Sequence, residues 1–372
     1  MTDAEAVTLQ HTVAWATLAI TFVLGIAMSR SNFCTMGAVA DVVNMGDWLR
    51  MRMWLAAIGI AVIGTQGLAW AGLIDPGKSI YAGPRLIWLS HAVGGALFGF
   101  GMVLASGCGT KTLLRAGAGN LKSLVVFIVM GLFAYMTLKG LFGVLRAGTV
   151  DRVVIELAVG QDLPRLIAGG NAALLGTMRL VLGALIGGGL LVFALASHEF
   201  RTDRDNLLGA LAVGAGIVAV WYVSGHIGHL DEDPRTLEEV FLGTNSTRME
   251  SLSYVAPTAY ALELLMFWSD ASKSVTLGIA SVLGLVAGST AYALATRSFR
   301  WEGFQGPEDT ANHLVGAALM GIGGVTALGC TIGQGLSGLS TLALGSVIAF
   351  AAIIAGGWGG LRYQMWRIER MV

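Results

Sequence analysis

The stretch HAVGGALFGFGMVLASGC, residues 91–108, has a second copy in the same chain. Shifted by 222 residues it lies over HLVGAALMGIGGVTALGC, residues 313–330, with 11 of the 18 positions identical. Shared glycines and alanines could follow from composition, but a histidine and a cysteine with the same separation of 17 residues could not. We therefore expect an internal duplication, with repeat halves at residues 11–147 and 175–363 of one membrane domain, 1–372.

The composition around these copies is that of a membrane protein. Of the 372 residues, 55% are hydrophobic and only 12% are charged, whereas soluble domains carry roughly 25% charged residues. Apolar runs long enough to cross roughly 30 Å of hydrocarbon as helices recur along the chain. The candidate spans are 11–29, 49–73, 88–106, 120–146, 175–197, 206–224, 256–268, 274–296, 312–328 and 341–362. We expect an all-α polytopic membrane protein, whose first helix is retained because MTDAEAVTLQ has no basic n-region.

The charges indicate how the chain is threaded through the bilayer. Net charge is zero, so no partnership with nucleic acid is expected. The tail after residue 361 holds three arginines and one glutamate, whereas the loop at 226–250 holds six acidic residues and two arginines. Basic residues gather on the cytoplasmic side of membrane proteins. We therefore expect a cytoplasmic C-terminus and a periplasmic N-terminus, which requires an odd number of full spans.

Three cysteines, Cys34, Cys108 and Cys330, lie where apolar runs break. None belongs to a CxxC pair, so neither a disulfide framework nor a structural zinc site is expected. The glycine-rich, polar residues that follow are too costly to face lipid, and we expect each cysteine on a re-entrant segment between two half-helices. The open N-terminus of a half-helix attracts anions. The counterpart of Cys34 in the second half is expected at residues 219–229, which hold no cysteine.

Residues beside the cysteines complete the candidate substrate site, where glycines let the chain turn: Gly107, Gly109 and Lys111 around Cys108, and Gly329 and Thr331 around Cys330. Thiols are soft donors, so the cargo is either a soft metal ion or a sulfur-containing anion. A lysine at a half-helix N-terminus would repel a metal cation, which favours the anion. Glu263, inside an apolar run, is the candidate for ion coupling. HIGH, residues 226–229, is interpreted as solvated loop rather than a metal site.

The chain resembles the YeeE/YedE family of sulfur transporters, which import thiosulfate. Three motifs carry the resemblance: SNFCTMGAVAD (31–41), GMVLASGCGTKTLLRAG (101–117) and GVTALGCTIGQGLSGLS (324–340). The resemblance implies inverted repeats with about nine transmembrane helices plus short re-entrant helices, arranged as an hourglass. It also implies that the three cysteines lie along the substrate path, and that a separate TusA-like cytoplasmic sulfur carrier receives the cargo.

The sequence therefore predicts a transporter of the cell inner membrane, not an enzyme and without a cofactor. Its expected cargo is thiosulfate or a close sulfur-containing anion, delivered to a cytoplasmic sulfurtransferase. Two alternatives stay open at this point. One is a membrane sulfurtransferase that forms a cysteine persulfide, and the other is a soft-metal or metalloid carrier.

Overall fold

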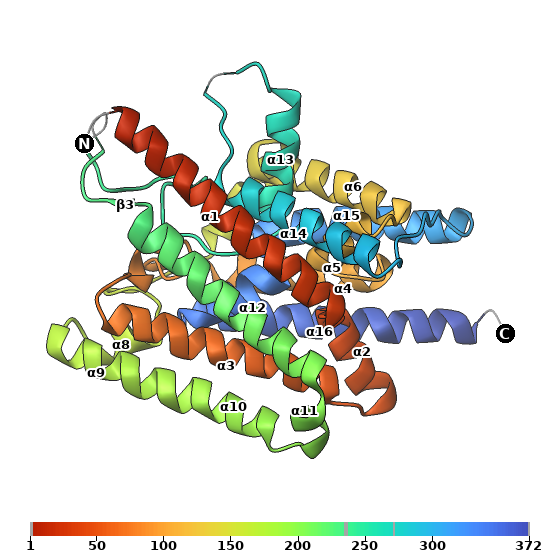
Figure 1. The fold of residues 1–372 in the computed structure, drawn as a ribbon, viewed down its shortest axis with the longest axis horizontal. Coiled ribbons are helices and arrows are strands. Elements are labelled where there is room, and N and C mark those ends of the chain that lie inside the picture. The colour runs from red at the N-terminus through yellow and green to blue at the C-terminus, as the bar shows by residue number, and fades with distance from the viewer. Residues whose placement is uncertain (1–2, 234–236, 271, 371–372) are drawn as a thin grey trace.

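The computed structural model describes residues 3–233, 237–270 and 272–370, which fold almost entirely as helices (Figure 1). The helices are α1 (Asp3–Arg30), α2 (Thr35–Met45), α3 (Leu49–Trp70), α4 (Trp88–Leu104), α5 (Gly109–Gly117), α6 (Leu121–Lys139), α7 (Leu141–Gly148), α8 (Leu163–Ala168), α9 (Ala172–Leu182), α10 (Gly188–Leu195), α11 (His198–Thr202), α12 (Arg204–Tyr222), α13 (Ala256–Met266), α14 (Leu277–Ala295), α15 (Pro307–Thr326) and α16 (Leu344–Glu369). The predicted all-α architecture is confirmed.

Short turns and strands connect these helices. The 3₁₀ turns are η1 (Pro76–Lys78) and η2 (Val150–Arg152), and the π-helical segments are η3 (Gly183–Gly187), η4 (Val223–Ile227) and η5 (Gly333–Gly338). Two antiparallel strand pairs are formed by β1 (Arg85–Leu86) with β2 (Ile155–Glu156), and by β3 (His229–Leu230) with β4 (Val240–Phe241). The strands are only two residues long, so helix packing holds the fold together.

Within the described residues, eight helical segments are long and apolar enough to cross a membrane. They are Glu5–Met45, Leu49–Trp70, Trp88–Gly117, Leu121–Lys139, Ala172–Leu195, Arg204–Ile227, Leu277–Ala295 and Leu344–Glu369. A polytopic membrane protein is thereby confirmed. The predicted span at 256–268 is wrong, because α13 has 11 residues and covers only about 16 Å of the roughly 30 Å required.

Glycines bring α4 and α15 into backbone contact at the centre of the bundle. A Cβ placed on Gly101 would lie 2.7 Å from the carbonyl oxygen of Gly316, and one on Gly316 would lie 2.6 Å from that of Gly101. The same reciprocal approach joins Gly94 and Gly323, at 2.8 and 2.6 Å. The pairing of early with late residues shows that the two helices cross antiparallel. Side chains of any size would separate them, which is the usual reason for small residues at helix contacts in lipid.

The helices around this crossing pack in matching pairs. α4 packs against α16, and α15 packs against α6. Likewise α1 packs along α14, and α12 packs along α3. In chain order, α1, α3, α4 and α6 of the first half correspond to α12, α14, α15 and α16 of the second. When each helix is replaced by its counterpart, one contact of a pair becomes the other.

The same order identifies the counterpart of Cys34. The cysteine directly precedes the short helix α2, and Val255 directly precedes the short helix α13. Residues 219–227 instead belong to the end of α12 and to η4. The expected counterpart at 219–229 is therefore wrong, because the long polar connection between η4 and α13 shifts the register of the two halves.

The termini lie at opposite ends of the molecule (Figure 1). The N-terminus and β3 are at the left of the view, and the C-terminus projects from α16 at the right. The N-terminus and the acidic 226–250 loop therefore share one side, as the charge pattern requires. Which of the two sides is cytoplasmic stays a prediction.

The glycine crossing generates a stability prediction. Gly101→Ala places a methyl group against the backbone of α15, and we expect the free energy of unfolding to fall by about 1–3 kcal/mol through overpacking. Gly359→Ala, on α16, is the matched control because a Cβ there meets nothing within 4 Å. Thermal denaturation of the detergent-solubilised protein measures both. Equal melting temperatures for the two variants would contradict the role of the crossing.

Candidate functional site

Each cysteine lies at the start of a short helix. Cys34 precedes α2, and its sulfur accepts a hydrogen bond from the Gly37 N–H at 3.3 Å. Cys108 precedes α5 in the same way. Cys330 precedes the helical residues 331–340, and its sulfur accepts from the Gly333 N–H at 3.5 Å. All three residues therefore break a long helix and begin a new one.

A left-handed residue precedes each cysteine by two positions. These residues are Asn32, Ser106 and Leu328, with φ of 50°, 56° and 59°. Left-handed backbone costs an ordinary residue roughly 1–2 kcal/mol, so the surrounding packing must hold it. The prediction that Gly107 and Gly329 let the chain turn is therefore wrong, because the turn is made one residue earlier.

The glycines beside the cysteines instead provide space. A Cβ on Gly107 would lie 3.3 Å from Cγ of Lys111, and one on Gly329 would lie 3.2 Å from Cγ of Gln334. Gly109 is less crowded, because its Cβ would meet the end of Met130 at 3.5 Å and Cγ2 of Val255 at 3.8 Å, both ordinary contact distances. The first two glycines thus let a following side chain fold back over the cysteine turn.

The structure brings the three thiols together in the interior. Cys34 and Cys108 contact each other through their side chains, and Cys108 also faces the hydroxyl of Thr331, the neighbour of Cys330. The three cysteines are 6%, 2% and 0% exposed, and all are free thiols in the described part of the chain. We call this row, in the order Cys34, Cys108, Cys330, the thiol path.

Lys111 lies at one end of the thiol path. Its ammonium group donates to the side-chain oxygen of Asn32 and acts electrostatically on both Cys34 and Cys108. Arg115 of the same helix donates to the carbonyl oxygen of Ser106 at 2.7 Å. The two basic side chains therefore cross-link the turns that carry Cys34 and Cys108 and leave positive charge beside their sulfurs.

The other end of the thiol path is lined by hydroxyl groups and one carboxyl group. Ser253 Oγ lies 4.0 Å from the Cys330 sulfur. Ser253 and Glu250 line a cavity of about 170 Å³ that reaches Gly329. Burial raises the pKa of the Glu250 carboxyl, although hydrogen bonds from Ser246 partly offset this. Sequence reasoning missed Asn32, Glu250 and Ser253, since nothing in their local pattern sets them apart from other loop residues.

Glu263, the predicted coupling residue, is held by two lysines. Its carboxylate accepts from Lys139 at 3.0 Å and from Lys273 at 2.7 Å, and the side chain is only 7% exposed. Two cations this close stabilise the ionised carboxylate. A role in coupling stays a prediction, but the observed role is to fasten α13 to α6 and to the segment just before α14.

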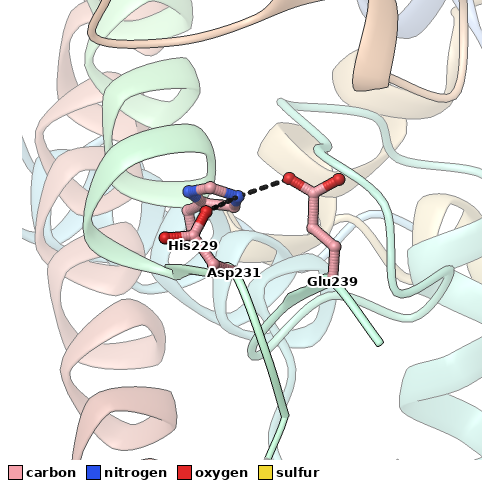
Figure 2. A group of neighbouring side chains, drawn as sticks. All are labelled: His229, Asp231 and Glu239. Atoms are coloured by element: carbon pink, nitrogen blue, oxygen red, sulfur yellow. Dashed lines mark hydrogen bonds and ion pairs between the residues drawn. The ribbon is translucent and has the colours of Figure 1, made fainter. Parts of the chain in front are cut away.

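The histidines of HIGH lie apart from the thiol path and do not converge. His226 stacks on Tyr222, whereas His229 forms a cluster with Asp231 and Glu239 (Figure 2). His229 Nε2 lies 2.6 Å from Glu239 and 3.9 Å from Asp231. Lys78 also pairs with Glu239, so the cluster already holds a cation. The geometry is that of an exposed ion-pair network on the loop.

Helices that cross the bilayer, broken at buried thiols beside a lysine, define a polytopic membrane transporter. The family model described as sulphur transport matches residues 30–359, and the chain belongs to that family.

Two relatives match along nearly the whole chain. The thiosulfate transporter TsuA of Escherichia coli (strain K12) is 27% identical over 90% of this chain and 90% of its own length. The thiosulfate transporter TsuA of Spirochaeta thermophila is 24% identical over 92% and 97%. The probable transporter YedE of Escherichia coli (strain K12) is 33% identical over 96 residues, which are 26% of this chain and 22% of that protein. A transporter rather than an enzyme is therefore supported over the full fold.

The Glu250 carboxyl generates a pH prediction. Its folded-state pKa is raised, so ionisation costs stability as pH rises above about 4.3, the ordinary value for glutamate. Glu250→Gln cannot ionise. We therefore expect the melting temperature of the variant, relative to the wild type, to increase with pH from about 4.3 and to level off once Glu250 is ionised in the folded protein. A difference that stays constant across this range would contradict the assignment.

Proposed function

We propose that this protein imports thiosulfate, or a close sulfur-containing anion, along the thiol path. The observation that carries the proposal is the meeting of three buried free thiols, from helix breaks far apart in the sequence, next to Lys111. The two relatives that match along nearly the whole chain are thiosulfate transporters, which supports thiosulfate as the substrate. Thiols suit the terminal sulfur of this anion, and a lysine suits its charge.

The proposal includes the architecture that transport requires. The halves at residues 11–147 and 175–363 form inverted repeats around the antiparallel crossing of α4 and α15, and the thiol path lies between them. The N-terminal side faces the periplasm and the C-terminal side faces the cytoplasm of a cell with an inner membrane. The matching helix pairs and the reciprocal glycine contacts support this arrangement.

Energetics require that entry of the anion be driven. Thiosulfate carries two negative charges, and an inside-negative potential of 100 mV opposes its entry by about 4.6 kcal/mol, at roughly 2.3 kcal/mol per charge. Consumption by a cytoplasmic sulfurtransferase, with a small TusA-like sulfur carrier as partner, would keep the internal concentration low. Coupling to protons is the rival source of energy.

Transfer along the path proceeds by hydrogen bonds from neutral S–H groups. Full desolvation of a charge costs on the order of 20 kcal/mol in the idealised case. Polar groups of the protein must therefore partly solvate the anion along the whole thiol path. Helix N-termini, Lys111 and the thiols supply it, and weak contacts permit release. A covalent relay through a cysteine persulfide is the alternative, in which sulfite would leave on the outside.

Replacing the cysteines tests the proposal. Cys34→Ala, Cys108→Ala and Cys330→Ala remove the thiol donors, and we expect each to lower uptake of labelled thiosulfate into proteoliposomes by about tenfold or more. Each variant is first checked for an unchanged melting temperature. Wild-type uptake by all three variants would refute the thiol path. Thiosulfate labelled separately on its two sulfur atoms decides the mechanism, since equal entry of both labels excludes the persulfide route.

Removing the charge of Lys111 gives a second test. Lys111→Met keeps the aliphatic stem but loses the ammonium group, and we expect KM for thiosulfate uptake to rise by about tenfold, the loss of a charged hydrogen bond. Lys78→Met is the matched control, because Lys78 is paired with Glu239 on the exposed loop cluster. Equal KM values for the two variants would show that Lys111 does not contribute to thiosulfate binding.

A further inference from the structure

A threonine accompanies each cysteine of the thiol path. Thr35 follows Cys34, Thr331 follows Cys330, and Thr110 lies two residues after Cys108. The three threonines are 2%, 1% and 0% exposed in the order Thr35, Thr110, Thr331. None of their hydroxyl groups has a hydrogen-bond partner among the described residues.

Their position denies these hydroxyls the acceptor that a helix usually offers. A buried threonine inside a helix normally donates to the carbonyl oxygen four residues before it, as Thr21 does to Thr17 at 2.7 Å and Thr326 to Ile322 at 2.7 Å. The three threonines of the thiol path lie in the first turn of their short helices, where the helix supplies no such carbonyl. Their buried donors are therefore available to something else, since unsatisfied buried hydroxyls are costly and uncommon.

The geometry places this polarity on the thiol path itself. The Thr331 hydroxyl faces the Cys108 sulfur, and the backbone N–H of Thr110 is directed to the same atom. On the far side of Cys330, the hydroxyls of Tyr81 and Tyr254 are also buried without a partner in the described part of the chain. Thiol and hydroxyl groups thus lie next to each other where Cys108 meets Thr331.

We propose that Thr35, Thr110 and Thr331 bind the oxygen atoms of the transported anion, while the neighbouring thiols contact its terminal sulfur. This inference rests on the proposed transport function and adds the basis of its specificity. An anion with a sulfur end and an oxygen end satisfies both kinds of donor. Sulfate offers only oxygen and hydrosulfide only sulfur, so each leaves one set of buried donors unpaired.

The test separates recognition from folding. Threonine→valine at each position keeps the side-chain shape and removes the hydroxyl, whereas threonine→serine keeps the hydroxyl. Among the described residues, these hydroxyls have no partner apart from the approach of Thr331 to the Cys108 sulfur, so we expect the valine variants to retain the wild-type melting temperature. We expect their kcat/KM for labelled thiosulfate in proteoliposomes to fall about tenfold or more, and the serine variants to stay within about threefold of the wild type, less than one lost hydrogen bond.

Thr17→Val is the matched control, because Thr17 is also fully buried and its hydroxyl has no partner among the described residues, but it lies in the middle of α1. It should alter neither uptake nor stability. Normal uptake by all three valine variants, with uptake lost in the cysteine variants, overturns the inference and leaves the proposed function standing. Normal uptake by the cysteine variants overturns the proposed function. A fall in melting temperature in the valine variants shows that the hydroxyls serve the fold, which also overturns the inference.

Discussion

The backbone contact between α4 and α15 determines where the Cys108 and Cys330 turns can lie. Gly94 against Gly323 and Gly101 against Gly316 fix two points of an antiparallel crossing, separated by seven residues along each helix, or about 10 Å. Because the helices run in opposite directions, α4 ends on one side of the crossing and α15 on the other. The break after each helix therefore opens from a different side, and the two cysteine turns meet over a short distance.

The sequence predicts most of this framework and less of the site. The duplication shows in aligned histidines and cysteines, and the apolar runs show the helices. The sequence could not identify Val255 as the counterpart of Cys34. Valine has no reactive group that would single it out, and the connection before it has no repeated counterpart. The left-handed turns at Ser106 and Leu328 could not be predicted either. Local preference assigns this conformation to glycine or asparagine, as at Asn32, and only the tertiary packing around the turn imposes it on serine and leucine.

The two ends of the thiol path differ in chemistry, although the proposed duplication relates them. Lys111 aligns with Gly333 under the shift of 222 residues, so the second half has no cation at this position. Asn32 lies two residues before Cys34, the N-cap of α2, and Ser253 lies two residues before Val255, the N-cap of α13. Asn32 and Ser253 therefore correspond in element order. At the first end Lys111 donates to Asn32, and at the second Ser253 approaches the sulfur of Cys330. One end is therefore cationic and the other is lined by hydroxyls, with Glu250 in the adjoining cavity.

In the proposed transport function, this difference sets where the anion rests, not how far it accumulates. Two charges 6 Å apart at an effective dielectric of about 20 interact by about 3 kcal/mol, or about 6 kcal/mol for a dianion. That exceeds the roughly 4.6 kcal/mol by which 100 mV opposes entry of the dianion. In the proposed orientation Lys111 can therefore hold the anion at the cytoplasmic end against the potential. A fixed charge supplies no net work over a full passage, so release inward still depends on an acceptor or a coupled ion. Retention beside Cys34 and Cys108 gives that acceptor time to remove the anion before it returns.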